Sequence, residues 1–515
     1  MIVKNLNFGN TAREQVFKGI EKLTNAVSST LGASGKCVIL EDAQGNPIIT
    51  KDGVTVADSI NLYDPVENMG ATLLKEAARK TVKEAGDGTT TATLLAYAIL
   101  EEAYKVLDKT NTRALKEGIL SGVEKVVKYL EKVSVPVSGD MIDQIATIAT
   151  NNDPELGKLI GDAFREVGET GVVMMEPSAL GETGIEIVEG VEYNKGLLNP
   201  NFITDKDKGT CELIDPLVMI VDSKIDSIRQ IQSVLEYVIK NKKSLFIIGE
   251  LEPQVLSALV MNKIKGNIKI NVVDPPAFGL RRKEILEDLA LLTNSQIVNE
   301  DLGDDLNTIE VDYLGTCLKA TTDSNQTIIQ VESVSEEIKP IIDKIKKDLK
   351  KKNNPGVVVG LEQRLARLSA KVAIVKVGAN SDVELKEKQD RVEDAICATK
   401  AAIKEGIVPG GGIALLNAAL NIEEDNIGEE VLSKAILAPF QKILDNGGLE
   451  SKTVPAKQGM GIDVVTGNMV HMIDEGIIDP LLVTKSALRN AASVASTIIS
   501  TDCVINNVRV DESSR

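Results

Sequence analysis

Apolar residues recur at helical spacing near the start of the chain. Between positions 11 and 31 they fall at Ala12, Val16, Ile20, Leu23 and Val27. Steps of three and four residues place such side chains on one face of a helix, and a following glycine, here Gly32, commonly ends it. Further helices are expected from Pro65 and after GDGTTTAT at 86–93, whereas CVIL, PIIT and GVTVAD between them are expected to be short strands. The first 130 residues are therefore predicted to be mostly helical.

The middle of the chain has a different pattern. LFIIG at 245–249 and INVVD at 270–274 are short apolar runs typical of buried strands, and a helical segment lies between them. Strand, helix and strand in this order favour a parallel sheet. A lysine-rich stretch ending at Pro355 is predicted to be a solvated helix. Because the last hundred residues return to an Ala-rich helical pattern, we expect the middle to be a domain inserted between two ends that fold together.

Length and charge narrow the class of protein. A chain of 515 residues is too long for one ordinary domain. Its formal net charge of −18 argues against nucleic acid or a membrane surface as partner, since both attract cationic proteins. Aromatic residues make up only 3%, which disfavours stacking platforms for single strands. His471 is the only histidine, so a multi-histidine metal site is excluded.

The cysteines and the N-terminus bear on the compartment. Five scattered cysteines without a CxxC pair favour reduced thiols over a disulfide framework. The N-terminal sequence MIVKNLNFGN lacks the basic and apolar pattern of a secretory signal. No run of 18 apolar residues is present, so no spanning helix is expected. We therefore expect a cytoplasmic protein.

The segment GDGTTTAT lies where a loop is expected to become a helix. Its two glycines allow close approach of the backbone to a ligand, and free N–H groups at a helix start favour an anion. Asp87 supplies an oxygen ligand suited to Mg²⁺ beside phosphate. A helix cap without any ligand is the structural alternative.

Other glycine-containing loops are weaker candidates for a phosphate site. TLGASG at 30–35 and TKDG at 50–53 favour phosphate, although an ordinary turn is the more usual interpretation of either segment alone. PGGG at 409–412 is another candidate for close approach of the backbone to a ligand. A Walker A motif is excluded, because Cys37 follows Gly35-Lys36 where serine or threonine would be required. Any nucleotide site is therefore of another kind.

Several of these segments together resemble one family. GDGTTTAT, TKDGVTVA, ENMGA, RVEDA, PGGGIAL and DEGIIDPLLVTKSALRNAASVAS stand in the order found in group I chaperonins, the GroEL family, which the chain resembles almost from end to end. The resemblance implies a multidomain fold. A mostly α-helical equatorial ATP-binding domain would comprise 1–133 and 405–515, a small α/β intermediate hinge domain 134–188 and 373–404, and an α/β apical domain with strand–helix units 189–372.

The resemblance also implies an activity. Chaperonins of this family are ATP hydrolases that form heptameric rings, usually stacked in pairs. They bind unfolded polypeptides and promote their folding in a cavity closed by a GroES-type co-chaperonin. Neither nucleic acid nor a membrane is an expected partner.

The same resemblance assigns roles to residues of the ATP site. Asp394 would direct hydrolysis once the intermediate domain swings down, and Asp52 would assist at the attacking water; by itself Asp394 is an ordinary helix-surface carboxylate. Asp87 would coordinate Mg²⁺, while K⁺ would be held by Thr30, Thr90 and the main-chain carbonyl of Lys51. The full set expected to bind ATP is Thr30, Leu31, Gly32, Ala33, Lys51, Gly53, Asp87, Gly88, Thr89, Thr90, Thr91, Gly411, Asp463, Val464, Val465 and Asp479.

An apolar apical groove is expected to bind unfolded chains and the mobile loop of the lid. Its predicted residues are Leu197, Phe202, Leu235, Leu256, Val260 and Met261. The helix-in-groove mode of binding recognises apolar character rather than a particular sequence. From the pattern alone, core is the favoured interpretation of these residues.

Some positions depart from the family. Ala33-Ser34 replaces a proline and a lysine, Asp463 replaces an asparagine, Asn201 and Gln232 replace a tyrosine and a leucine of the groove, and Ala370-Lys371 replaces a hinge glycine pair. The final VRVDESSR stands in place of a Gly-Met-rich tail. A second interpretation is therefore a ring that holds unfolded chains without a lid-driven cycle. A third is a metabolic nucleotide-dependent enzyme on an unrelated fold.

Overall fold

The computed structural model divides into two compact units, unit 1 (Met1–Gly161 and Val377–Arg515) and unit 2 (Asp162–Lys376). The two ends of the chain thus form one unit and the middle the other, while the finer division into three domains stays a prediction. The structure describes residues 4–507 except 42–44, 46, 140, 151–152, 169–171, 179–180, 194, 207, 276–279, 301–302, 307–308, 310, 332–337, 350–360, 362–363, 366–367, 369–370, 380 and 450–456. Ala370 and the terminal segment from 508 lie outside the described residues.

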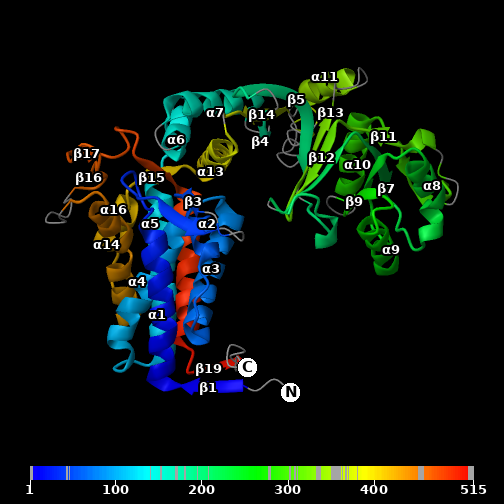
Figure 1. Ribbon diagram of the computed structural model, residues 1–515. Helices are drawn as coiled ribbons and strands as arrows, with labels where there is room; N and C mark the ends of the chain where they lie inside the picture. Colours follow the sequence, from blue (N-terminus) through cyan, green and yellow to red (C-terminus); the bar gives the residue numbers. More distant parts are fainter. Residues whose placement is uncertain are drawn as a thin grey trace. The chain divides into compact units, whose positions relative to one another are not determined.

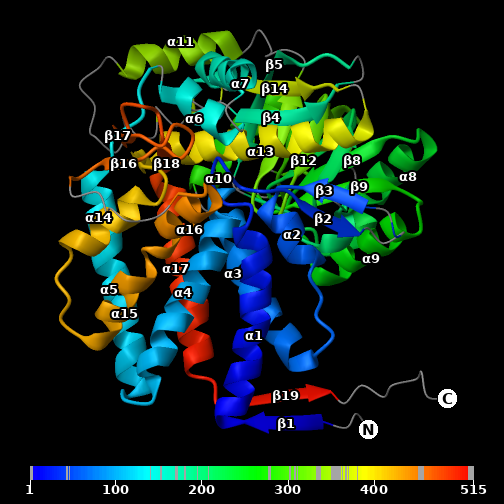
Figure 2. The same ribbon diagram turned by 60° about the vertical axis from the view of Figure 1, so that its left-hand side comes forward.

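Unit 1 is a bundle of long helices with small two-stranded sheets at its margins (Figures 1 and 2). Its elements are β1 (Lys4–Phe8), α1 (Gly9–Ser28), β2 (Val38–Glu41), β3 (Pro47–Thr50), α2 (Gly53–Ser59), α3 (Pro65–Ala85), α4 (Thr89–Leu107), α5 (Thr112–Val133), α6 (Met141–Ala149), α13 (Asp382–Glu405), β15 (Ile407–Pro409), α14 (Ile413–Asn421), α15 (Ile427–Ala435), α16 (Ala438–Asn446), β16 (Met460–Ile462), β17 (Met469–His471), β18 (Ile478–Pro480), α17 (Leu481–Ile499) and β19 (Cys503–Asn507). Helix α7 (Pro154–Val167) crosses the boundary between the units.

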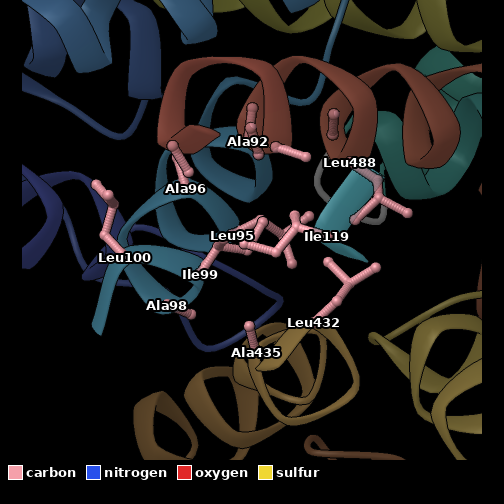
Figure 3. Close-up of a cluster of buried hydrophobic side chains, with 14 of the residues drawn as sticks. Ala92, Leu95, Ala96, Ala98, Ile99, Leu100, Ile119, Leu432, Ala435 and Leu488 are labelled. Atoms are coloured by element: carbon pink, nitrogen blue, oxygen red, sulfur yellow. The ribbon is translucent and has the colours of Figure 1, made fainter. Parts of the chain in front are cut away.

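The core of unit 1 forms around α4. In Figure 3 its Leu95 and Ile99 lie among Ile119 of α5, Leu432 of α15 and Leu488 of α17, and all of these side chains are buried. Alanines alternate with the larger residues of α4, which lets neighbouring helices approach closely. This packing is what holds the start of α4, and with it the GDGTTTAT segment, in a fixed place.

The expected strand at GVTVAD is wrong: these residues form the helix α2. The two carboxylate oxygens of Asp52 accept hydrogen bonds from the amides of Val54 (3.1 Å) and Thr55 (2.7 Å), which caps the helix. An N-cap of this kind contributes about 1 kcal/mol and outweighs the β propensity of the valines and threonine. CVIL and PIIT, by contrast, contribute the antiparallel pair β2–β3 as expected.

Unit 2 contains two sheets. One has the order β4-β14-β5-β13-β12-β6, and the other β10-β7-β8-β9 with β11 beside β7. The strands β7, β8 and β9 are parallel, with α9 between β8 and β9, which confirms the predicted strand–helix–strand unit. Its elements are β4 (Val172–Pro177), β5 (Gly184–Tyr193), β6 (Cys211–Ile214), β7 (Pro216–Val221), α8 (Gln232–Lys240), β8 (Ser244–Ile248), α9 (Pro253–Ile264), β9 (Lys269–Val273), α10 (Leu280–Thr293), β10 (Ile297–Val298), β11 (Gly315–Thr316), β12 (Lys319–Thr322), β13 (Thr327–Val331), α11 (Ile338–Leu349) and β14 (Lys371–Val377).

Candidate functional site

Two glycines shape the turn between α3 and α4. Gly86 ends α3 with φ +75°, and Gly88 precedes α4 with φ +96°, a region that side chains other than glycine rarely adopt. No side chain caps the start of α4. The amides of its first turn, at Thr89, Thr90 and Thr91, have no partner within the helix and point toward its open end, where an anion is favoured.

The TKDG loop meets this helix start directly. A Cβ atom on Gly53 would lie 2.4 Å from Oγ1 of Thr90, so only glycine fits there. Asp52 precedes Gly53. Its carboxylate is held in place because it accepts hydrogen bonds from two backbone amides of α2. Each of its oxygens accepts one backbone amide and retains lone-pair capacity for another donor. Lys51 is half-buried just before it.

A third loop follows α1 and is held by α16. The side-chain amide of Asn446 donates to the carbonyls of Ser28 and Leu31, both at 2.9 Å. Gly32, with φ +83°, packs against Ile443, and a Cβ there would lie 3.2 Å from its side chain. The buried Thr30 hydroxyl donates to the Val27 carbonyl at 2.9 Å. Ala33 follows on an exposed turn.

Helix α13 brings Asp394 to the same place. Gly86 lies against α13 so closely that a Cβ would be 2.4 Å from the Cβ of Cys397, one turn after Asp394. Further along, Ala402 of α13 is buried with Ile145 of α6 and Ile478 of β18. In this structure α13 is therefore docked on the loops of unit 1.

The carboxylates gathered here raise one another's pKa. Burial raises the pKa of Asp394 well above its usual range, and the negative charges of Asp87 and Asp52 raise it further. The pKa of Asp87 is raised first by burial and then by Asp52, while a hydrogen bond from the Gly88 amide opposes the rise. Both residues keep solvent-exposed surface, so they are surrounded by protein but remain accessible to a ligand. Burial and then Asp87 raise the pKa of Asp479 to about 7.

The residues predicted to contact a nucleoside lie on adjoining segments. Asp479 pairs with Val408 in the β15–β18 ladder, which leads into the PGGG turn, where Gly411 has φ +65°. Val464 lies against Gly447, at the end of the α16 helix that holds Leu31. These contacts place the residues predicted to bind the nucleoside and those predicted to bind phosphate in one region of unit 1.

Asp463 is engaged within its own loop. Its carboxylate accepts hydrogen bonds from the Val465 amide (2.9 Å) and the Thr466 hydroxyl (2.6 Å), which close the turn between β16 and β17. Asp463 therefore has a local structural role in this turn.

The side chains of this region fit a cation that is coordinated mainly by the oxygens of a bound phosphate and only partly by the protein. Among the described residues, no group of three or more His, Cys, Asp or Glu side chains could hold a metal ion. Mg²⁺ commonly binds one or two carboxylates together with phosphate oxygens, and the accessible Asp87 beside an open helix start meets that requirement.

One acidic residue of this region was not predicted. Asp390 lies one turn before Asp394 on α13, and burial followed by the charge of Asp52 raises its pKa to about 6. The signal that could have identified it is the spacing in DRVED, which places both aspartates on one face of the helix.

The groove residues of unit 2 differ widely in exposure. Phe202 is fully buried and Val260 nearly so, which places both in the core of the unit. Leu197, Leu235 and Leu256 are half-buried, whereas Met261 is 52% exposed. The large apolar side chains exposed on α8 and α9 are Tyr237, Ile239, Met261 and Ile264.

The family assignment follows from the sequence profile of the TCP-1/cpn60 chaperonin family, which matches residues 23–509. The chain belongs to this family. This membership excludes the interpretation as a metabolic enzyme on an unrelated fold. No helix in the described part of the chain is long and apolar enough to cross a membrane.

Two crystal structures of one viral protein share the fold. The chaperonin gp146 from the bacteriophage EL 2 (Pseudomonas aeruginosa), in the presence of ATP-BeFx, is similar with a TM-score of 0.75 in crystal form II and 0.66 in crystal form I. Each match has 21% sequence identity and covers 98% of this chain and 99% of gp146. These likenesses confirm the expected multidomain, GroEL-like fold class.

Proposed function

We propose that unit 1 binds ATP together with Mg²⁺ and hydrolyses it. The observation that carries this proposal is the meeting of Asp52, Asp87 and Asp394 at the uncapped start of α4. An open helix start favours phosphate, yet the neighbouring carboxylates repel it unless a cation is bound as well. A nucleotide with its metal satisfies both conditions, and it would also relieve the repulsion among the carboxylates.

The residues divide the work of hydrolysis. When bound, Mg²⁺ neutralises phosphate charge, with Asp87 as its protein ligand. Asp394 orients the attacking water by accepting its hydrogen bond, and Asp52 assists from the cap of α2. Phosphoryl transfer asks the protein mainly for such positioning and charge neutralisation. A K⁺ ion at Thr30, Thr90 and the Lys51 carbonyl completes the proposed site.

Replacing Asp87 by asparagine tests this assignment. Asp87→Asn removes the metal ligand but keeps the side-chain shape, so Mg²⁺-dependent ATP binding should fall at least tenfold in calorimetry. Asp108→Asn, at the exposed opposite end of α4, is the matched control. Equal affinities for the two variants would contradict the role of Asp87.

We further infer that the chain forms chaperonin rings of the group I kind, heptameric and stacked in pairs. The two-stranded sheets of unit 1 support assembly, because β2–β3 exposes Ile39 and Ile49, and β1–β19 exposes Phe8 and Ile505. Isolated two-stranded sheets are marginal in water and gain stability when another surface covers them. Negative-stain images of the pure protein should show seven-fold rings; particles without that symmetry would refute the heptamer.

The exposed side chains of α8 and α9 support capture of unfolded polypeptides, and we propose that a GroES-type lid then closes the cavity in a folding cycle. A scattered apolar surface of isoleucine, methionine and tyrosine recognises apolar character without demanding a sequence. The predicted cytoplasmic location stays a prediction.

A holdase is the second candidate function. Its support is the polar character of the groove: Asn201 and Gln232 are exposed, and Gln232 donates to Glu236 at 2.7 Å. Refolding of a stringent client with and without a GroES-type partner separates the two candidates. A folding machine gains yield from the lid, whereas a holdase gains nothing.

A further inference from the structure

A buried lysine of α3 is bonded to the C-terminal end of α2, the helix that Asp52 caps. Lys75 is only 6% exposed. Its ammonium donates hydrogen bonds to the main-chain carbonyls of Ile60 at 2.5 Å and of Asp58 at 3.3 Å. A lysine is almost never buried unless its charge is paired or hydrogen-bonded, because removing that charge from water is costly. The carbonyls at the end of α2 meet this requirement for Lys75.

These carbonyls are the ones that a helix end leaves without partners. Helix α2 ends at Ser59, and Ile60 is its C-cap. The last carbonyls of a helix have no amide partner within it, and a lysine side chain can supply the missing donors. Arg79 also binds this turn, through two hydrogen bonds of 2.7 and 3.1 Å to the Asp58 carboxylate, but that pair is exposed. Lys75 is therefore the buried attachment of α2 to α3.

The N-terminal end of α2 lies at the proposed hydrolytic site. The Asp52 carboxylate accepts hydrogen bonds from the amides of Val54 and Thr55, which fixes it to the first turn of α2. Gly53 lies against Thr90 at the start of α4. A helix of seven residues is too short to be stable by itself, so its place is set by the segments that it contacts. A shift at one end of α2 should therefore move the other end, about 10 Å away.

We propose that Lys75 is a positioning residue that fixes α2 and thereby sets the place of Asp52 beside the start of α4. The inference rests on the proposed function, in which Asp52 assists at the attacking water. Lys75 acts through the carbonyls at the end of α2 and needs no contact with the nucleotide. A displacement of about 1 Å at a catalytic group can cost about 100-fold in rate, so even a small shift of α2 should lower turnover.

Turnover and nucleotide affinity should respond differently to the loss of Lys75. Phosphate and Mg²⁺ are assigned to the start of α4 and to Asp87, whereas Asp52 is assigned to the attacking water. An interaction that is made only in the transition state affects kcat and leaves substrate binding unchanged. Loss of Lys75 should therefore lower kcat while the KM for ATP stays nearly the same.

The experiment compares Lys75→Met with Lys80→Met in the full-length protein. Methionine keeps an unbranched side chain but donates no hydrogen bond, so the two carbonyls lose their partner. Lys80 is an exposed lysine of the same helix, 3.8 Å from Glu84 in a surface pair that contributes little. At saturating ATP, turnover of Lys75→Met should fall about tenfold, with KM within about twofold of the wild type. Lys80→Met should match the wild type.

A double-mutant cycle with Asp52→Asn shows whether Lys75 acts through Asp52. Asparagine caps a helix as well as aspartate does, so α2 stays formed while the carboxylate is lost. In this background Lys75→Met should lower turnover by less than about twofold, because the group that it positions is already gone. A purely structural role would give the same tenfold fall in both backgrounds. That result, or unchanged turnover of Lys75→Met, would overturn the proposal.

Lys75→Gln keeps the experiment decisive if Lys75→Met does not fold. Its side chain is one atom shorter and retains an N–H donor, so it should disturb α2 less. A fall in turnover that disappears in the Asp52→Asn background supports the proposal, and equal falls in the two backgrounds overturn it. A failed role for Asp52 would instead appear as unchanged turnover in Asp52→Asn alone, so the two failures are distinguishable.

Discussion

In unit 1, glycines let the backbone of a loop lie directly against side chains of another segment, whereas the exposed surface of α8 and α9 in unit 2 is formed by side chains that face solvent. Gly53 and Gly86 leave no room for a Cβ atom because Thr90 and Cys397 lie against them. Tyr237 and Met261 in unit 2 are exposed to solvent, so their side chains are not confined in this way. A site for phosphate needs fixed positions, and a surface for unfolded chains needs only apolar character. The two regions should therefore respond to substitution in opposite ways.

The largest effect is expected at a groove residue that lies in the core. Phe202→Ala should lower the opening free energy of unit 2 by about 3–5 kcal/mol, because it deletes a fully buried aromatic side chain. Hydrogen exchange of β8 and β9 in the full chain measures this loss. A change below 1 kcal/mol would contradict a stabilising role of Phe202 in the core.

A smaller effect, a specific loss of ATP turnover, is expected in unit 1. Gly86→Ala combines strain at φ +75° with a clash against Cys397, and should displace α13 and lower ATP turnover about 100-fold. Gly139→Ala carries comparable strain, at φ +53°, but meets nothing within 4 Å. Steady-state hydrolysis compares the two. Equal losses would mean that backbone strain, and not the contact with α13, matters.

Surface substitution in unit 2 should separate binding from stability. Met261→Ser removes an exposed apolar side chain and should weaken capture of an unfolded client about threefold to tenfold. Its stability should change by less than about 0.5 kcal/mol. Anisotropy of a labelled, unfolded client measures the affinity. Unaltered capture would exclude this part of α9 from the binding surface.

The smallest expected effect is on how the thermal stability of the protein depends on pH through Asp479. Asp479 has a pKa of about 7 in the folded protein, above the usual value near 3.9, so its contribution to stability is complete below about pH 4 and is lost as the pH rises through 7. Asp479→Asn cannot ionise, and its Tm should exceed that of the wild type by about 2–4 °C at pH 8. Calorimetry at pH 5 and pH 8 checks this. A difference in Tm between variant and wild type that does not widen as the pH rises would contradict the predicted direction.

Local sequence signals predicted the regions where backbone constraints dominate. The glycines and aspartate of GDGTTTAT indicated a helix start near an anion, and α4 begins at Thr89 with its amides free of any cap. The apolar runs at 245–249 and 270–274 became β8 and β9, because buried parallel strands have a distinctive composition.

Other features depended on contacts that a linear pattern does not contain. GVTVAD forms a helix because the Asp52 cap outweighs β propensity, and Phe202 is buried although it follows an exposed Asn201. The raised pKa of Asp390 has the same origin, because burial and the charge of Asp52 depend on how the folded segments pack. Resemblance identified Asp394, since a single carboxylate on a helix carries no signal of its own.

ATP turnover and nucleotide affinity of Asp394→Ala, measured on the same assembled protein, test the central claim most directly. Binding of ATP and ring assembly should persist while hydrolysis falls about 100-fold or more, because the carboxylate that orients water is gone. Unchanged turnover with intact binding would contradict it and would remove α13 from the hydrolytic site.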